Sequence, residues 1–406
     1  MKLSKRLLAL AAAMCMTVPM FTACGDTNAG GNAEEGGAGA AGTVAEGEAS
    51  IVIGGIGPLT GATAVYGNAV KNAAQLAVDE INEAGGVNGI KFVLDFQDDE
   101  NNEEKAVNAY NTLKDHDVKA LVATVTSAPC IAVGAESAKD NIFQITPSGS
   151  AIDCTAGENA FRVCFTDPGQ GQTAAKYIKE QGLSQKVAVI YDSSDVYSTG
   201  IYEGFTAEAA AQGIEIVAAE AFTADSKTDF SVQIQKVQES GADLLFLPIY
   251  YQEAALILTQ ADKVGLDIQI FGSDGFDGII DQLGGDVALA QDVMLMTPFS
   301  ASSTEEKSAA FTSAYKAKYN DEVPNQFAAD AYDAVYIIKA CMEHASINDA
   351  SISASDFCDA LKTAMTEITY DGVTGSTTWT ADGEPTKAAK VVKINVEDGT
   401  GSYVEI

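Results

Sequence analysis

The chain has 406 residues, of which 47% are hydrophobic and 20% are charged, so it has room for two domains with buried cores. The 57 acidic and 24 basic residues give a formal net charge of −33, which argues against a nucleic acid partner because phosphates demand a basic surface. The simpler interpretation is that the excess of acidic residues keeps the protein soluble.

The N-terminus has the pattern of a bacterial secretion signal. Three basic residues precede an apolar run over 7–20 that is too short to span a membrane comfortably. Small residues then precede Cys24, an arrangement that resembles the lipobox of bacterial lipoproteins, with Phe21 in place of the usual Leu. We predict a signal peptide over 1–23 and a lipid on Cys24; ordinary secretion with cleavage nearby is the alternative.

The next segment, 24–49, is composed mainly of Gly, Ala and Glu and has almost nothing to bury. This composition predicts a flexible tether. A lipid anchor followed by a tether places the rest of the chain outside the cytoplasm, at the outer face of the bacterial cell membrane. No later stretch of the sequence is long and apolar enough to span the membrane, so we expect the lipid to be the only membrane attachment.

Five of the seven cysteines lie beyond Cys24. In an extracytoplasmic protein, closely spaced cysteines are candidate disulfides. The candidate pairs are Cys154 with Cys164 and Cys341 with Cys358. The alternative is that all of them stay reduced. The fifth residue, Cys130, is expected to be buried at a helix start.

From residue 50 onward, strand patterns alternate with helix patterns, which is typical of parallel sheets covered by helices on both faces. The fold class is therefore α/β, with two lobes of similar design. The first lobe has expected strands at 50–54, 91–96, 121–125 and 142–145 and expected helices at 68–84 and 103–114, with a further helical segment ending near 138. The second has expected strands at 186–191, 214–220, 242–247 and 268–271 and expected helices at 170–180, 198–212, 229–239 and 252–264.

The last third begins with an expected strand at 293–297 and continues with three expected helices, at 304–319, 326–344 and 355–365. This helical block is expected to return and cover the first lobe. The tail, with Trp379, Asp382-Gly383 and 390–396, has the pattern of a β-hairpin.

Two expected strands of the first lobe end in small hydroxyl residues. The run 121–125 is followed by Thr126 and Ser127, and the run 142–145 by Ser148, Gly149 and Ser150. The carboxyl ends of parallel strands meet at one edge of a sheet, where α/β proteins bind ligands. Hydroxyls and backbone amides in front of a helix dipole suit a small anion such as a carboxylate.

Four further residues follow expected strands or face the same edge. Tyr66, Tyr197 and Tyr250 offer aromatic walls, and Asp274 offers a negative charge for an ammonium group. Together these residues predict a cleft for a small zwitterion. The alternatives are that each tyrosine serves only packing and that Asp274 is a helix N-cap.

The motifs of the common enzyme and metal classes are missing from the sequence. The turn GIGPLTG (55–61) imitates a dinucleotide fingerprint, but it has one residue too many before its third glycine, and Pro58 removes an amide. The sequence lacks HExxH, GxSxG and phosphate-loop motifs, as well as a zinc cluster and a calcium loop. We therefore predict a non-enzyme with no metal and no cofactor.

The sequence resembles the substrate-binding proteins of ABC transporters for branched-chain amino acids, the leucine/isoleucine/valine-binding family. The likeness covers nearly all of 51–396 and is carried by IGPLTGATAVYGNAVKNAAQLAVDEINEAGGVNG, the strand-end TS, ITPSGS, GQTAAKYI, IYYQEAALILTQADKVGL, FGSDGF and a terminal W-x-x-D-G. It implies a type I periplasmic binding protein fold: two Rossmann-like lobes joined by crossovers near Thr166, Pro298 and Gly375. The implied lobes are 50–166 with 299–375, and 167–298 with 376–406.

The resemblance also implies roles for the site residues. Ser127, Ser148 and Ser150 are expected to meet the α-carboxylate and part of the ammonium, while Tyr250, Tyr66 and Tyr197 line the pocket. Asp274 stands where many relatives have Glu as the ammonium partner, so the ligand must shift or use a water to reach this shorter side chain.

The function that follows is a monomeric, lipid-anchored receptor that delivers an aliphatic amino acid to an ABC permease. The alternatives are the same trap for a polar amino acid, an amide or an aromatic acid, and a surface-anchored nucleotide-dependent enzyme. A chemoreceptor-like sensor domain is disfavoured, because the sequence carries neither a membrane span nor a signalling domain.

Overall fold

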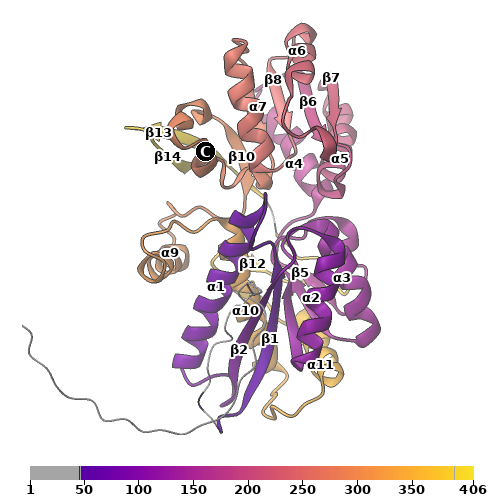
Figure 1. Cartoon of the computed structure of the whole chain (residues 1–406), viewed down its shortest axis with the longest axis vertical. Coiled ribbons are helices and arrows are strands. Elements are labelled where there is room, and N and C mark those ends of the chain that lie inside the picture. The colour runs from indigo at the N-terminus through magenta and orange to yellow at the C-terminus, as the bar shows by residue number, and fades with distance from the viewer. Residues whose placement is uncertain (1–44, 46, 388) are drawn as a thin grey trace, which may run out of the picture. The chain divides into compact units, whose positions relative to one another are not determined.

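The computed structural model describes residues 45, 47–387 and 389–406 (Figure 1). The predicted signal peptide, the predicted lipid site Cys24 and nearly all of the predicted tether lie outside the described residues. No helix in the part of the chain that the structure describes is long and apolar enough to cross a membrane.

The first sheet has five parallel strands in the order β2-β1-β3-β4-β5. Its elements are β1 (Ser50–Gly57), α1 (Ala64–Glu83), β2 (Lys91–Asp98), α2 (Glu103–Asp115), β3 (Val118–Ala123), α3 (Ser127–Asp140), β4 (Phe143–Thr146), the 3₁₀ turn η1 (Ile152–Thr155) and β5 (Ala160–Arg162). We call this sheet with its covering helices lobe 1. Strand and helix alternate as the sequence predicts, although α1 begins four residues earlier than expected.

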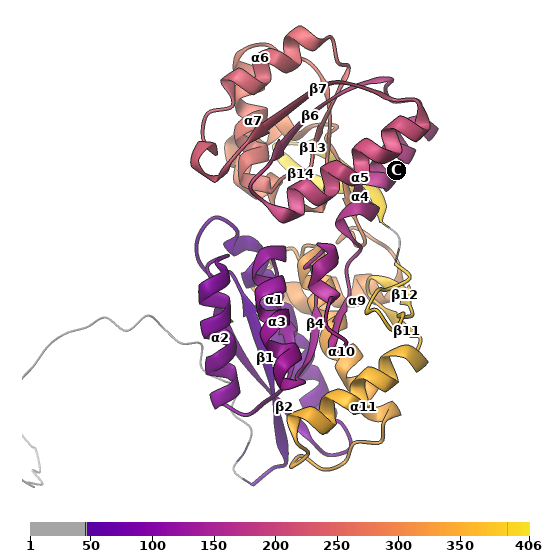
Figure 2. The ribbon, with the colours of Figure 1, turned by 90° about the vertical axis from the view of Figure 1, so that its right-hand side faces the viewer.

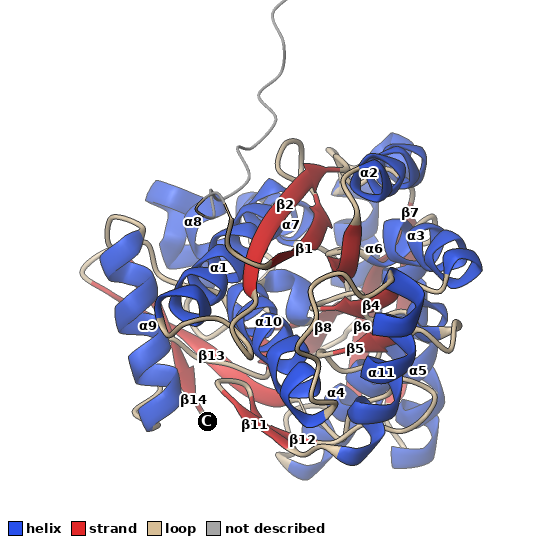
Figure 3. Cartoon of the chain, turned by 90° about the horizontal axis from the view of Figure 1, so that it is seen from below, coloured by secondary structure: helices blue, strands red, loops and turns tan. Residues whose placement is uncertain are grey.

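Helices cover both faces of this sheet because side chains alternate along each strand (Figure 3). In β3, Ala120 and Val122 pack in the cluster that contains residues of α1 and α10 (Gln326–His344). Leu121 and Ala123 pack on the opposite face, against α2 and α3. The continuous apolar run of β3 is therefore buried on both sides.

The second sheet has seven strands in the order β14-β13-β10-β9-β8-β6-β7. The strands β6 to β10 run parallel, and β13 and β14 add an antiparallel edge. We call this sheet with its covering helices lobe 2. Its elements are α4 (Asp167–Glu180), β6 (Lys186–Asp192), α5 (Val196–Gln212), β7 (Glu215–Phe222), η2 (Ala224–Ser226), α6 (Ser231–Ser240), β8 (Leu244–Leu247), α7 (Tyr251–Lys263), β9 (Gln269–Gly272), η3 (Asp274–Phe276), α8 (Ile279–Leu283), η4 (Gly284–Ala290), β10 (Met294–Thr297), β13 (Lys390–Glu397) and β14 (Thr400–Glu405).

The same alternation covers both faces of the second sheet (Figure 2). In β6, Val187 and Val189 pack with residues of α4 and α5, whereas Ala188 and Ile190 pack with residues of α6 and α7. The chain crosses between the two lobes three times: after β5, after β10 and after β12 (Gly375–Thr377), which pairs only with β11 (Tyr370–Gly372). The α/β fold class is confirmed, while the exact lobe boundaries stay a prediction.

Three helices follow β10, close to the expected ranges: α9 (Glu306–Lys318), α10, and α11 (Ala354–Glu367). Helix α10 packs against α1, and α11 packs against β3 and β4. The helical block therefore covers lobe 1, as expected from the sequence.

The hairpin of the tail differs from the prediction. It joins β13 to β14 through Asp398 and Gly399, both of which have positive φ (50° and 76°), as the favoured two-residue turn requires. The other Asp-Gly pair, Asp382-Gly383, lies in a local loop closed by a single bridge between Trp379 and Pro385. The tail has two Asp-Gly pairs, and only the second of them joins two strands.

The predicted disulfides are absent from the structure, which corrects that expectation. All five cysteines beyond Cys24 are buried free thiols. Cys154 packs with Cys130 rather than with Cys164. Cys341 and Cys358 are buried in the apolar core that α10 and α11 share, where thiols pack as small hydrophobic groups.

Candidate ligand-binding site

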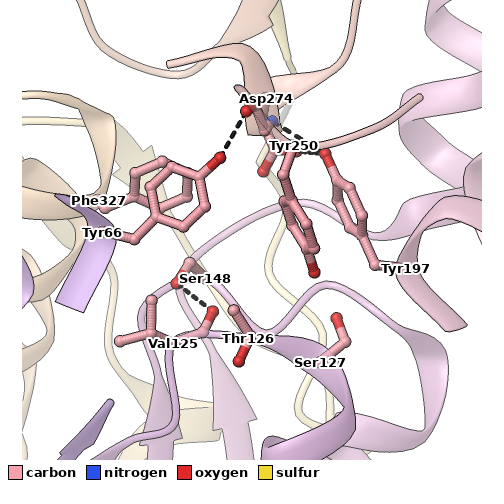
Figure 4. A pocket seen from close by; sticks show the side chains of 10 residues that line it. Tyr66, Val125, Thr126, Ser127, Ser148, Tyr197, Tyr250, Asp274 and Phe327 are labelled. Atoms are coloured by element: carbon pink, nitrogen blue, oxygen red, sulfur yellow. Dashed lines mark hydrogen bonds between the residues drawn. The ribbon is translucent and has the colours of Figure 1, made fainter. Parts of the chain in front are cut away.

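A small pocket lies where the strands of both sheets end (Figure 4). About 240 Å³ in and at the mouth of the pocket, part of it open to solvent, is not filled by protein atoms. Its walls come from loops after β3 and β4 in lobe 1, from loops after β6, β8 and β9 in lobe 2, and from the helices α1 and α10. The lining residues are Tyr66, Val125, Thr126, Ser127, Ser148, Tyr197, Tyr250, Asp274, Gly275 and Phe327.

The pocket brings together six of the eight residues expected to bind ligand: Tyr66, Ser127, Ser148, Tyr197, Tyr250 and Asp274. Gly149 and Ser150 do not line it. The Gly149 N–H donates to Thr146 Oγ1 at 2.7 Å, and a Cβ at Gly149 would stand 2.9 Å from the sulfur of Cys130. Gly149 therefore packs against the interior of lobe 1.

Ser127 is the first residue of α3, and its hydroxyl is held in place by the next loop. Its Oγ accepts hydrogen bonds from the backbone N–H groups of Ser150 and Ala151, both at 3.2 Å. The hydroxyl proton remains available to a ligand oxygen. The N-cap residue Thr126 makes no side-chain cap, so the first N–H groups of α3 also remain open to an anion.

Ser148 has the opposite hydrogen-bonding role. Its hydroxyl donates to the carbonyl of Val125 at 2.6 Å, which leaves lone pairs free to accept a hydrogen bond. An ammonium group needs acceptors of this kind. The lobe 1 wall therefore offers donors at Ser127 and an acceptor at Ser148.

The lobe 2 wall is organised around Asp274, which follows β9 and is 3% exposed. Its Oδ1 accepts a hydrogen bond from the Tyr197 hydroxyl at 2.6 Å, and its N–H donates to the side-chain oxygen of Gln170 at 3.1 Å. Burial raises the pKa of Asp274 to about 6, while the Tyr197 hydroxyl and the Gln170 side chain act in the opposite direction. The side chain does not cap the short helix η3, whose N-cap is Ser273.

Aromatic rings close the pocket. The ring of Tyr197 stacks on that of Tyr250, with centroids 4.7 Å apart and planes at 6°. The Tyr66 hydroxyl donates to the carbonyl of Gly275 at 2.5 Å and so joins lobe 1 to lobe 2. Phe327 packs on Tyr66, with centroids 4.3 Å apart. Together they form an apolar wall beside the polar groups.

Phe327 is the main lining residue that the sequence analysis did not single out. It lies in the first turn of α10, after the N-cap Asn325, in a helix whose apolar pattern predicts only packing. The sequence feature that could have indicated Phe327 was its position at the start of a helix, shortly after Pro324. Val125 is missed for the same reason, because it continues the apolar run of β3.

Two polar groups of the glycine-rich turn after β1 already have hydrogen-bond partners within the protein. The Leu59 N–H and the Thr60 hydroxyl donate to the two carboxylate oxygens of Asp98, at 2.8 and 2.7 Å. A Cβ at Gly67 would stand 1.9 Å from the carbonyl oxygen of Pro58, so α1 begins in close contact with this turn. An amide bound to a carboxylate is not free for a phosphate, which agrees with the rejection of a dinucleotide site. Within the described residues, no group of three or more metal-ligating side chains is gathered at one place.

Two α/β lobes with a small polar pocket at the carboxyl ends of their strands define the class of two-lobed solute-binding proteins. A family model described as periplasmic binding protein matches residues 50–400. The chain belongs to this family, within the group of branched-chain amino acid ABC transporter substrate-binding proteins, and has the type I fold.

Two curated relatives are similar over most of their length. The Leu/Ile/Val-binding protein BraC3 of Rhizobium johnstonii is 33% identical over 81% of this chain and 89% of that protein. The leucine-, isoleucine-, valine-, threonine- and alanine-binding protein of Pseudomonas aeruginosa is 31% identical over 72% of this chain and 78% of that protein. Both are named as binding proteins.

Solved structures agree on the fold. The substrate-binding protein LivJ of Streptococcus pneumoniae, crystallised with isoleucine, has a TM-score of 0.77 and 30% identity, covering 88% of this chain and all of that one. The leucine-binding protein LivK of Thermotoga maritima has a TM-score of 0.76 at 23% identity, over 87% of this chain and 97% of that one.

Proposed function

We propose that the protein is an extracytoplasmic, lipid-anchored receptor that binds an aliphatic amino acid and delivers it to an ABC permease. One observation carries the proposal. The pocket brings the open N-terminus of α3, with Ser127, together with a buried acid, Asp274. Donors on the lobe 1 wall and an acid on the lobe 2 wall of one pocket match the two charged ends of a free amino acid.

In the proposed mode, the ligand carboxylate accepts hydrogen bonds from Ser127 and the first N–H groups of α3. The ammonium donates to Asp274 and Ser148. The side chain of the ligand lies among Val125, Tyr66 and Phe327, an apolar wall that favours an aliphatic group.

Closure of the lobes stabilises binding by excluding water. The contact of Tyr66 with Gly275 and that of the Tyr251 hydroxyl with the carbonyl of Ala62, at 2.8 Å, are available only when the lobes meet. In a site closed to water, the charged contacts are stronger than in an open cleft. A ligand that favours the closed state shifts the population toward it.

The remaining assignments rest on the sequence and on the family. The proposed anchor is a lipid on Cys24, added when the signal peptide 1–23 is removed, and the proposed tether is 24–49. We further propose that the receptor is a monomer and has no catalytic activity. The proposed lobe boundaries are 50–166 with 299–375, and 167–298 with 376–406.

The test is a thermal-shift screen of the purified protein, without its signal peptide, against the standard amino acids, benzoate and nucleotides, followed by calorimetry on the hits. We expect stabilisation by leucine, isoleucine or valine and a micromolar or tighter Kd. Stabilisation by nucleotides alone would overturn the proposal. Stabilisation by benzoate or by polar amino acids alone would support a solute-binding protein but would change the proposed ligand.

A further inference from the structure

One buried carboxylate in the binding region has no partner. Asp167, the first residue of α4, is 1% exposed, and neither of its side-chain oxygens makes a hydrogen bond. Two other buried acids have partners: Asp333 accepts from Val373 and Thr374, and Asp330 pairs with Lys387. A buried, unpaired acid is costly, so its retention calls for an explanation.

The neighbours of Asp167 carry unsatisfied groups as well. The hydroxyl of Ser150 and the side-chain nitrogen of Gln170 are both buried without a hydrogen-bond partner. The Asp167 N–H donates to the carbonyl of Ser150 at 2.9 Å, and the Gln170 side chain accepts from the Asp274 N–H. Three unsatisfied polar side chains therefore gather where the chain passes from lobe 1 into lobe 2, next to the acid of the pocket.

Packing leaves room for this acid. Gly200 of α5 lies against it, and a Cβ at Gly200 would stand 2.9 Å from that of Asp167. Capping of α4 does not require the acid, because the Thr166 hydroxyl already accepts from the Gly169 N–H at 3.1 Å. An acid at a helix start interacts with the helix dipole when it is exposed too, so this role does not require the burial of Asp167.

Two of the three charged side chains that act on Asp167 are negative. Burial raises its pKa well above the usual range, the charges of Asp274 and Asp195 raise it further, and Arg162 lowers it. The guanidinium of Arg162 does not pair with Asp167, since its Nη2 contacts Glu384 at 2.9 Å. Ser150 lies beside Asp167 and also lowers its pKa, although neither side chain makes a well-formed hydrogen bond to the other.

We propose that Asp167 is a second anionic partner of the ligand's ammonium group, acting together with Asp274, with Ser150 and Gln170 as its polar neighbours. This inference rests on the proposed function and deepens it. Two acids around one ammonium select strongly for an amino acid against the corresponding 2-oxo acid, which brings a carboxylate but no cation. Because Asp167 lies at the first crossover, the contact also couples ligand binding to the junction of the lobes.

The test compares Asp167→Asn with the unmodified protein by calorimetry, using L-leucine and its 2-oxo acid, 4-methyl-2-oxopentanoate, as probes. Loss of a charged hydrogen-bond partner predicts a roughly 10- to 100-fold weaker Kd for leucine. The preference for leucine over the oxo acid should fall by at least tenfold. A double-mutant cycle with Asp274→Asn should show non-additive effects, since both acids contact one group.

The matched control is Asp229→Asn. Asp229 is an exposed acid just before α6 of lobe 2, and Asn preserves its hydrogen bond from the Ser231 N–H. Its Kd and its preference for leucine should stay within twofold of the unmodified protein. An Asp167→Asn variant that keeps both quantities unchanged overturns the inference while leaving the proposed function intact. Failure of the unmodified protein to bind any amino acid removes the proposed function itself, and this inference with it.

A second measurement covers the case in which Asp167→Asn does not fold. Asp274→Asn retains Asp167 as its acid and should release a proton when it binds leucine, seen as a binding enthalpy that depends on the ionisation enthalpy of the buffer. Release of a proton on binding supports the inference. No release overturns it.

Discussion

The hydroxyl of Tyr197 stands 2.6 Å from Oδ1 of Asp274 and 2.7 Å from the hydroxyl of Ser273, and it accepts the N–H of Gly275 at 2.9 Å. One phenol thus fixes the position of the acid that is proposed to meet the ammonium. Asp274 has a shorter side chain than the Glu of many relatives. The hydrogen bond from Tyr197 compensates for this difference, because it orients the carboxylate before the ligand arrives.

Tyr197→Phe should therefore weaken amino acid binding. The ring stack on Tyr250 is kept, but the hydrogen bond to a charged acceptor is lost, which is worth about 1.5–3 kcal/mol and predicts a roughly 10- to 100-fold higher Kd. Calorimetry measures the change. The control is Tyr202→Phe, at a tyrosine that stacks on Tyr191 away from the pocket. Equal affinities for the two variants would contradict the role of the phenol.

Binding should also depend on pH. With a pKa of about 6, Asp274 is ionised in roughly one molecule in ten at pH 5, so the apparent affinity for an amino acid should fall about tenfold between pH 7.5 and pH 5. Calorimetry across this range gives the profile. Asp274→Asn should flatten it, apart from any contribution of Asp167, and a flat profile in the unmodified protein would show that Asp274 does not meet the ammonium.

The same shift affects folding stability, with the opposite sign. The folded-state pKa of Asp274 is raised above its ordinary value, so between about pH 4 and pH 6 the folded chain binds more protons than the unfolded chain. The contribution of Asp274 to the stability of the unliganded protein therefore falls as the pH rises through this window. A bound ammonium reverses this effect, and stabilisation by leucine in thermal unfolding should be larger at pH 7 than at pH 5.

The sequence predicted the frame of this site better than the direction of its side chains. Two sheets of parallel strands follow from the alternation of apolar runs and helical spacing, and the strand ends indicated Ser127 and Asp274, which both line the pocket. Gly149 and Ser150 follow the same strand as Ser148, yet only Ser148 reaches the pocket, because the path of a loop is decided by tertiary contacts such as that of Gly149 with Cys130. Phe327 was not predicted, because the sequence pattern does not distinguish an aromatic residue at a helix start from a residue that packs in the core.

The hydrogen bond that Tyr66 makes across the lobes should control how long the ligand stays bound. Tyr66→Phe removes the donor to the Gly275 carbonyl but keeps the ring in the pocket. A neutral hydrogen bond is worth about 1 kcal/mol, so we expect a roughly fivefold faster dissociation, measured by stopped-flow fluorescence. Tyr319→Phe is the control, since its hydroxyl donates to the carbonyl of Asn72 at 2.6 Å, outside the pocket. A change in association alone would contradict the proposed role.

The five cysteines beyond Cys24 should react as free thiols. Their burial among apolar or packed groups, rather than in bonded pairs, predicts that all five are alkylated when the protein is unfolded without a reductant. Peptide mass spectrometry locates the modified residues. Any linked peptide containing Cys154 and Cys164, or Cys341 and Cys358, would restore the disulfide prediction made from the sequence.

Asp333 of α10 should be required for the stability of the segment that leads back to lobe 2. It is 1% exposed and accepts hydrogen bonds from the N–H groups of Val373 and Thr374, both at 2.9 Å, and from the Thr374 hydroxyl at 2.6 Å. Asp333→Ala leaves two backbone donors without a partner in the interior, which costs about 1–3 kcal/mol for each group. We expect a loss of about 2–5 kcal/mol in urea unfolding, whereas Asp371→Ala, at an exposed acid paired with Lys307, should leave the midpoint nearly unchanged. Equal midpoints for the two variants would mean that water replaces the carboxylate at no cost, and that this segment does not depend on α10 for its conformation.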